Sequence, residues 1–173
     1  HHVMLSHGLA VPLIKSNVAD AQVGIALSLH PLRAASENEE DQDAMQRHDG
    51  LRNRWFLDPL FGRGYPLDIQ AHCAEFLPKI HDGDIEHIAT SIDFLGINYY
   101  FPETITAAPE NPPLHTRLRE LPGRERTDFG WEVAPDVWCI DTCSTYADGT
   151  PFGDGTVLGV IDGKQFNKIK LKD

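Results

Sequence analysis

Side chains that could act on a ligand gather where apolar segments of the sequence end. Residues 94–97 form a short apolar run, and Asn98, Tyr99 and Tyr100 follow it directly. A run of this kind predicts a buried strand whose last residues emerge at a functional site. The plainer interpretation is that Tyr99 and Tyr100 simply suit a strand, as aromatic residues often do.

Three sequence blocks, at residues 55–66, 93–100 and 127–133, occur in the order and spacing of a known family. Together they resemble the family 1 glycoside hydrolases, the retaining β-glucosidases, and the resemblance covers about residues 1–135. It implies a closed (β/α)8 barrel, which takes about 250 residues or more. This chain has 173. We therefore expect an α/β fold, a partial (β/α)8 TIM-barrel fragment from the middle of the barrel with parallel strands, followed by a β-rich C-terminal tail over residues 136–173.

Retaining hydrolysis of a glycoside requires two carboxyl groups about 5 to 5.5 Å apart. The resemblance places the acid/base in a Thr-x-Asn-Glu-Pro motif and the nucleophile in a Thr-Glu-Asn-Gly motif, and neither motif occurs in this sequence. Glu39 and Glu110 stand beside Asn residues, but Glu40 follows Glu39, and Glu110 lies in a Pro-rich segment; surface charges are the expected role. No catalytic residue is therefore assigned, and we expect the chain to be inactive alone.

Asn98 and Tyr100 match the family's Asn-x-Tyr at the end of the sixth barrel strand. The resemblance implies that the Tyr hydroxyl hydrogen-bonds the nucleophile and that the Asn lines the same pocket, which binds a β-glucoside or a glucose-like sugar. Barrel sites are built at the carboxyl ends of the strands. Phe129 and Trp131 could offer ring faces to a pyranose, but packing is the commoner role of such residues.

The composition of the sequence limits the kinds of molecule that the chain is expected to bind. Fifteen Lys and Arg against 26 Asp and Glu give a net charge of −11, which disfavours nucleic acids and anionic membrane surfaces. No apolar run approaches the roughly 20 residues of a membrane span, no signal segment is visible, and three cysteines form no disulfide framework, so a cytoplasmic location is expected. Cys139 and Cys143 lack a second ligand pair for zinc. Neither a metal nor a cofactor is predicted.

The segments that position these residues follow from periodicity and turn signals. We expect a helix over residues 1–15, a parallel strand over 23–29 that ends at His30, and a surface helix over 36–54 with a Ser36–Glu39 capping box. A turn-rich loop over 57–66 should precede a helix over 67–76 and the strand at 93–98. Five prolines within residues 101–126 predict an excursion loop.

The tail is predicted to contain short strands, the clearest case being an apolar run at 157–161 followed by the hairpin signal Asp162-Gly163. A frameshift or fusion origin of the tail stays open. For the whole chain, a non-catalytic sugar-binding or scaffold module is the alternative to an inert barrel piece. Because two strands cannot close a barrel, we expect self-association or a complementary barrel fragment as partner.

Overall fold

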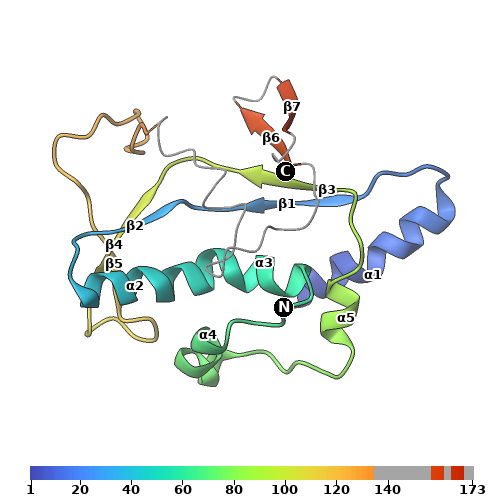
Figure 1. The fold of residues 1–173 in the computed structure, drawn as a ribbon, viewed down its shortest axis with the longest axis horizontal. Helices are drawn as coiled ribbons and strands as arrows, with labels where there is room; N and C mark the ends of the chain where they lie inside the picture. The colour runs from blue at the N-terminus through green and yellow to red at the C-terminus, as the bar shows by residue number, and fades with distance from the viewer. Residues whose placement is uncertain (135–156, 162–164, 170–173) are drawn as a thin grey trace.

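A computed structural model describes residues 1–134 and the backbone of residues 157–161 and 165–169. The helical elements are α1 (His2–Asn17), α2 (Glu39–Asp49), the π-helix η1 (Gly50–Arg54), α3 (Trp55–Leu60), α4 (Leu67–His72), the 3-10 turn η2 (Ala74–Phe76) and α5 (Asp84–Ile88). The strands are β1 (Gly24–Ser28), β2 (Leu32–Ala34), β3 (Phe94–Asn98), β4 (Glu103–Ala107), β5 (Thr116–Leu118), β6 (Val157–Ile161) and β7 (Gln165–Ile169). The helices lie along one side of the long strands (Figure 1).

The first sheet has the strand order β1-β3-β6-β7. β1 and β3 are parallel neighbours, in a register that runs from Gly24 opposite Phe94 to Ser28 opposite Asn98. This confirms the predicted pairing of the two apolar runs, whose helical crossover is the arrangement expected of an α/β unit. β6 lies parallel to β3, and β7 returns antiparallel to β6, so the predicted hairpin is also confirmed. The remaining predictions for the tail, including those for Cys139 and Cys143, lie outside the described residues.

A second, smaller sheet has the order β2-β4-β5 and contradicts the predicted excursion loop over residues 101–126. β4 runs parallel to β2 and pairs antiparallel with β5. The prediction was wrong because the five prolines stand outside these strands and leave every ladder N–H in place. β1 leads into β2, and β3 leads into β4 (Figure 1). The parallel pair β1–β3 of the first sheet is thus followed, after a short interruption, by the parallel pair β2–β4 of the second sheet.

The helix at α2 starts later than the predicted capping box. Asn38 is the N-cap, and its side-chain Oδ1 accepts a hydrogen bond from the Asp41 N–H at 2.8 Å. Ser36 instead donates to the Asp41 carboxylate at 2.7 Å. Asn ranks with Asp and Ser as the best N-cap residues, and here Asn38 caps the helix while Ser36 contacts the Asp41 side chain.

The predicted loop over residues 57–66 is helical in its first part, because α3 continues directly from η1. Pro59 is the next-to-last residue of α3, and Gly62 follows the helix with a φ of 76°. The rest of the loop is pinned by Tyr65, which is buried and stacks on Trp55 with ring centroids 4.2 Å apart.

Helices α1 and α5 make a close contact at Gly8. A Cβ atom at this position would lie 2.0 Å from the His87 carbonyl oxygen, so the two helix backbones touch where no side chain intervenes. Between the helices and the first sheet lies the hydrophobic core, whose buried members include Met4, Leu27, Leu29, Trp55, Leu57, Leu60, Ile69, Ile88 and Leu95. The core therefore fixes the strands from one face.

Candidate functional site

The two predicted site residues stand at the carboxyl end of β3. Asn98 lies opposite Ser28 at the end of β1, and its carbonyl oxygen accepts a hydrogen bond from the Leu29 N–H at 3.2 Å. Asn98 is half-buried, whereas Tyr100 is 54% exposed. Both therefore occupy the same end of the sheet as His30, as the sequence predicts.

Four aromatic side chains gather beside this strand end, and we call them the aromatic cluster: Tyr100, Phe101, Phe129 and Trp131. Trp131 is central, with ring centroids 5.4 Å from Tyr100, 5.3 Å from Phe101 and 5.5 Å from Phe129. Phe129 is 84% exposed and Trp131 38% exposed. The cluster thus leaves apolar ring surface open to a ligand, in addition to packing.

A turn holds Trp131 in place. The Thr127 N–H donates to the Trp131 carbonyl at 2.9 Å, and the Trp131 N–H donates to the Thr127 hydroxyl at 3.2 Å. On the neighbouring residue, the buried Glu132 carboxylate is paired with Arg33 and lies 3.7 Å from Arg124. The aromatic cluster is therefore anchored to β2 through Arg33.

A charged cluster that the sequence did not predict lies where the two sheets meet. It consists of His30 after β1, His48 on α2, Arg52 on η1 and Glu103 at the start of β4. Glu103 Oε1 lies 3.3 Å from His30 Nδ1 and 3.5 Å from Arg52 Nη2, while its Oε2 lies 3.3 Å from His48 Nε2. The His contacts have ion-pair distances but not the alignment of full hydrogen bonds, so His30 Nδ1 and Glu103 Oε2 have no hydrogen-bond partner. We call this set the charged cluster.

Burial and the neighbouring charges set the protonation of this cluster. Burial lowers the pKa of His30; Glu103 opposes this effect, and Arg52 and His48 add to it. Burial alone would raise the pKa of Glu103, but the contacts with His48, His30 and Arg52 outweigh it and leave the pKa below its ordinary value. Near neutral pH, Glu103 is therefore an anion beside a neutral His30.

The backbone of His30 is fixed separately. The Asn53 side chain accepts from the His30 N–H at 3.0 Å and donates to the His30 carbonyl at 2.9 Å. Asp49 in turn accepts from Asn53 at 2.8 Å. A strand end held at both backbone groups is a rigid place from which to present a side chain.

The two Glu residues weighed as catalytic carboxylates do not join this site. Glu39 is exposed at the first turn of α2, and the exposed Glu110 lies 3.7 Å from Arg117. Among the described residues, no group of three or more His, Cys, Asp and Glu side chains is arranged to hold a metal ion. No helix in the described part of the chain is long and apolar enough to cross a membrane.

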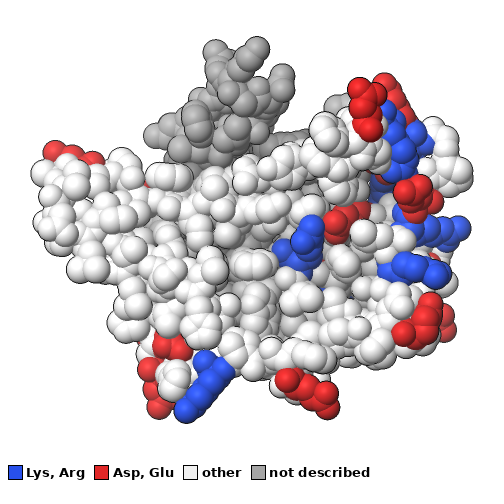
Figure 2. All heavy atoms as spheres, turned by 180° about the vertical axis from the view of Figure 1, so that it is seen from behind, with Lys and Arg blue, Asp and Glu red and all other residues white. Residues whose placement is uncertain are grey.

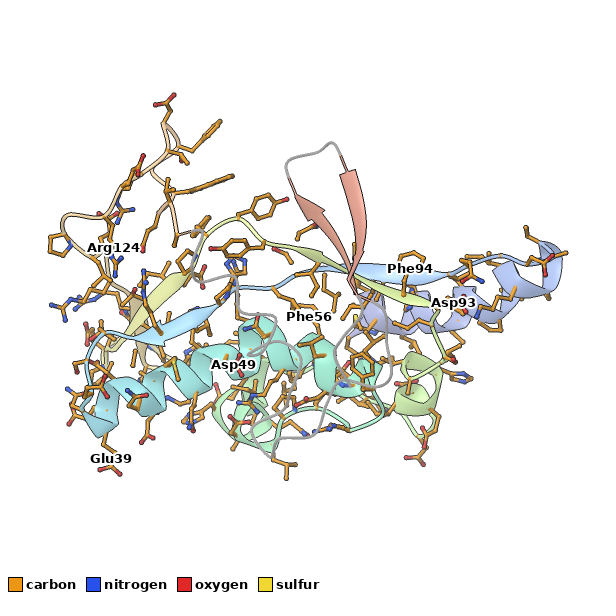
Figure 3. The ribbon with its side chains drawn as sticks, turned by 45° about the horizontal axis from the view of Figure 1, so that its top comes forward. Glu39, Asp49, Phe56, Asp93, Phe94 and Arg124 are labelled. Atoms are coloured by element: carbon orange, nitrogen blue, oxygen red, sulfur yellow. The ribbon has the colours of Figure 1, made fainter. Side chains whose placement is uncertain are left out.

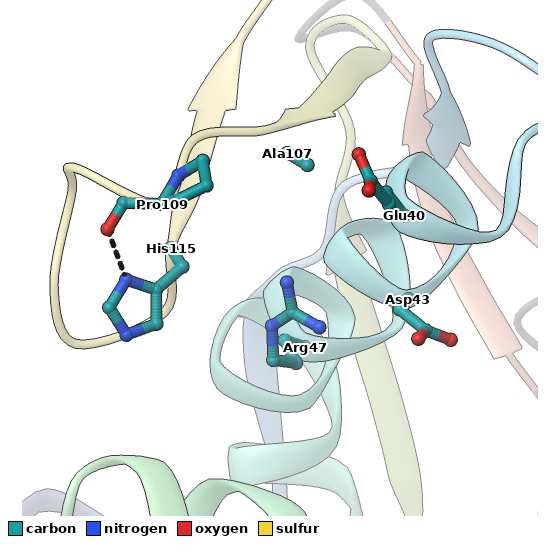
Figure 4. A pocket seen from close by; sticks show the side chains of 6 residues that line it. All are labelled: Glu40, Asp43, Arg47, Ala107, Pro109 and His115. Carbon is teal, nitrogen blue, oxygen red and sulfur yellow. Dashed lines mark hydrogen bonds between the residues drawn. The ribbon is translucent and has the colours of Figure 1, made fainter.

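A surface pocket of about 400 Å³ lies between α2 and the β4–β5 turn (Figure 4). Its lining mixes charges of both signs and consists of Glu40, Asp43, Arg47, Ala107, Pro109 and His115. The His115 ring is held by the Pro109 carbonyl at 2.8 Å, and Arg47 donates to the Leu114 carbonyl at 2.9 Å. Because the Arg47 and His115 side chains already contact backbone carbonyl groups, this pocket is a weaker candidate site than the strand ends.

Comparison with known proteins identifies the family. The model of glycosyl hydrolase family 1 matches residues 1–147. This chain belongs to that family. Among its relatives, beta-glucosidase A of Acetivibrio thermocellus is 34% identical over 142 residues, which is 79% of this chain and 31% of the relative. Beta-glucosidase A of Thermotoga maritima is 31% identical over 138 residues, 79% of this chain and 30% of the relative. The chain thus spans about a third of the length of these family 1 proteins.

Solved family 1 structures agree with the fold. A beta-glucosidase from Exiguobacterium marinum superposes with a TM-score of 0.81 at 30% identity, covering 96% of this chain and 40% of the other. The family 1 beta-glucosidase from Thermotoga maritima gives a TM-score of 0.69 at 29% identity, over 76% of this chain and 29% of the other. The fold is thus a part of the family 1 barrel, with parallel strands that do not close within the described residues.

Some residues of the candidate site could be predicted from the sequence, and others could not. His30 follows a buried strand, as do Asn98 and Tyr100, and position after a strand is a usable signal. His48 and Arg52 stand four positions apart on neighbouring helical turns, yet this spacing alone is typical of a solvated helix face. Glu103 lay inside the segment interpreted as a loop, so its burial could not be predicted.

Proposed function

We propose that the chain is a β-glucosidase-type piece of the family 1 barrel that contributes part of the sugar site and does not hydrolyse glycosides alone. The observation that carries this proposal is the meeting of Asn98, Tyr100 and the aromatic cluster at one end of parallel strands β1 and β3. Strand ends of this kind are where barrel enzymes bind substrate. Asn98 would bind a sugar hydroxyl, and Tyr100 would present its hydroxyl toward the missing half of the site.

The proposed lack of activity rests on the carboxylates. Retaining hydrolysis needs one carboxyl group as acid and a second as nucleophile. Two carboxylates beside the aromatic cluster, Glu103 and Glu132, are buried and lie against Arg52 and Arg33 respectively. Neither is free to act on an anomeric carbon, and the two family motifs that carry the catalytic Glu residues do not occur in this sequence.

An experiment on the full chain tests both parts. Incubation with an aryl β-glucoside should give no hydrolysis above background, while titration with the same glucoside should shift the NMR signals of Asn98, Tyr100 and Trp131. Tyr100→Ala should abolish these shifts, and Phe76→Ala should not, because Phe76 is a comparably exposed aromatic residue on η2. Turnover that persists after repurification and is lost in a Glu variant of this chain would overturn the proposal.

The alternative is a non-catalytic sugar-binding or scaffold module, and the aromatic cluster favours sugar binding over a scaffold. Saturable binding that glucose competes away, without turnover, would support this module. Absence of any binding would leave an inert barrel piece that needs complementary strands. In either case, we propose residues 1–135 as the barrel part, residues 136–173 as the tail, a role in carbohydrate metabolism and a cytoplasmic location.

A further inference from the structure

The charged cluster of His30, His48, Arg52 and Glu103 lies next to the proposed sugar site but supplies no group to it. Glu103 is 6% exposed and His30 is 4% exposed. Burying a carboxylate is costly unless cations and hydrogen-bond donors surround it. Here the carboxylate, itself on β4, contacts the end of β1, α2 and η1. The ribbon in Figure 3 shows α2 running beside β2 and β4. The contacts that hold the Glu103 carboxylate therefore also hold the junction of the two sheets.

The neighbours of His30 determine which ring nitrogen carries its proton. Arg52 Nη2 lies 3.0 Å from His30 Nε2, and a guanidinium can only donate. Nε2 must therefore hold the lone pair, and the ring proton sits on Nδ1, which faces Glu103 Oε1 at 3.3 Å. This tautomer is assigned from the partners of the ring. Ser28 Oγ, at 3.4 Å from Nε2, is the other group within reach.

The Phe101 ring connects His30 with the rest of the aromatic cluster. Phe101 packs edge-on against His30 with centroids 5.8 Å apart, and Phe101 in turn contacts Trp131. Trp131 contacts Tyr100, which carries the hydroxyl of the proposed site. An unbroken series of contacts thus runs from Glu103 through His30 and Phe101 to Trp131.

We propose that Glu103 is a positioning residue for the sugar site: through His30 and Phe101 it holds the aromatic cluster in place, and protonation of His30 releases that hold. The sugar-binding part of this inference rests on the proposed function. A second ring proton would sit on Nε2 and point at Arg52, so a donor would face a donor and that contact would be lost. Two cations, His30 and Arg52, would then share the single carboxylate of Glu103.

The test uses the full chain with ¹⁵N-labelled histidine and the Trp131 indole signal as reporter. Near neutral pH, His30 should be neutral with its proton on Nδ1. As the pH falls, the Trp131 signal should move together with the His30 titration. E103Q, which keeps the shape and removes the charge, should shift the Trp131 signal at neutral pH and weaken aryl β-glucoside binding about tenfold or more, equivalent to about 1.4 kcal/mol. E103D, which restores the charge, should recover part of the binding.

Asp84→Asn is the matched control. Asp84 is a comparably buried carboxylate, 9% exposed, which lies 3.1 Å from His1 Nε2 on the helical side of the chain. This variant should leave the Trp131 signal in place. A His30 ring that is charged or protonated on Nε2 at neutral pH would overturn the proposal, as would a folded E103Q with an unmoved Trp131 signal. Should E103Q not fold, the pH titration of the unaltered chain decides. Should no sugar bind, the proposed function fails, whereas the Trp131 response still decides the positioning role.

Discussion

The Asp41 side chain on α2 accepts a hydrogen bond from the backbone N–H of Ala107 on β4 at 2.8 Å. The same oxygen accepts from the Thr106 hydroxyl at 2.8 Å, and the other carboxylate oxygen accepts from Ser36. One carboxylate therefore joins the start of α2 to the central strand of the second sheet. Charge-assisted hydrogen bonds of this kind are stronger than neutral ones.

Asp41→Ala should lower the melting temperature by several degrees, because it leaves the Ala107 N–H and the Thr106 hydroxyl without their acceptor. Asp43→Ala, an exposed position on the same helix, is the control and should have little effect. Thermal unfolding followed by circular dichroism provides the measurement. Equal melting temperatures for the two variants would show that Asp41 does not join α2 to β4.

Asp58→Asn tests a buried carboxylate whose loss of hydration is not fully offset by hydrogen bonds and nearby cations. Burial raises the pKa of Asp58 to about 6, although Arg54 and Arg63 oppose the effect, and Oδ1 has no hydrogen-bond partner. Because the folded state binds this proton more tightly than the unfolded chain, the group favours folding at low pH. That advantage, about 3 kcal/mol at most, is lost as the pH rises from near 4 through about 6. Urea unfolding at several pH values should show that Asp58→Asn removes this dependence and is the more stable protein above pH 7.

Asp93 should contribute to stability with the opposite pH dependence, because its pKa is lowered and not raised. The hydrogen bond from Lys15, followed by that from the Val23 N–H, lowers the pKa of Asp93. Its contribution to stability is therefore present above the ordinary Asp pKa and is lost as the pH falls through the lowered value. Asp93→Asn should destabilise the chain at neutral pH and leave stability unchanged in strong acid. The same direction of pH dependence in the Asp58 and Asp93 variants would contradict this assignment.

Gly8→Ala should separate α1 from α5. The added methyl group would meet the His87 carbonyl at 2.0 Å and the Ile88 Cα at 2.9 Å, both backbone atoms that cannot rotate away. We expect a loss of about 1–3 kcal/mol or more in the free energy of unfolding. Ser6→Ala, on the exposed side of the same helix, should cost little. If Gly8→Ala unfolds in the same urea concentration as the unaltered chain, the helices are not in backbone contact.

The outer edge of β1 should drive association. β1 is the terminal strand of its sheet within the described residues, and an unpaired strand edge is a template for another chain. Nearby, α1 exposes Val3, Leu9, Leu13 and Ile14. In Figure 2, charged side chains gather toward the end that carries β2, β4 and β5 and leave the opposite end largely uncharged.

Sedimentation should therefore detect concentration-dependent oligomers of the full chain. Ala26→Lys places a charge at an exposed position of β1 and should shift the population toward monomer. Glu86→Lys on α5, which also makes the chain more positive, by two charges instead of one, at an exposed position off the sheet edge, should not. Monomers at all concentrations in the unaltered chain would show that this edge is protected.

The sequence predicted those parts of the fold in which local pattern and tertiary structure agree. The apolar runs that became β1 and β3 are visible in the sequence alone, and the two strands pack against the hydrophobic core through Leu27 and Leu95. β4 could not be predicted in this way, since the flanking prolines gave a stronger local signal than its five residues. Asn98 and Tyr100 were found by their position after a strand, whereas Glu103 owes its place to β4, so the charged cluster became visible only in the structure.

The pairing of β1 with β3 joins segments that are far apart along the chain: Val23 and Asp93, whose contact precedes the paired strands, are separated by 70 positions. Closing so long a loop costs conformational entropy before any strand contact compensates for it. Folding should therefore begin within the individual helices, whose internal hydrogen bonds are local, and the sheet should form late. During that delay both strands are exposed, and the time spent in this state, rather than the stability of the final fold, determines how much of the chain aggregates during synthesis.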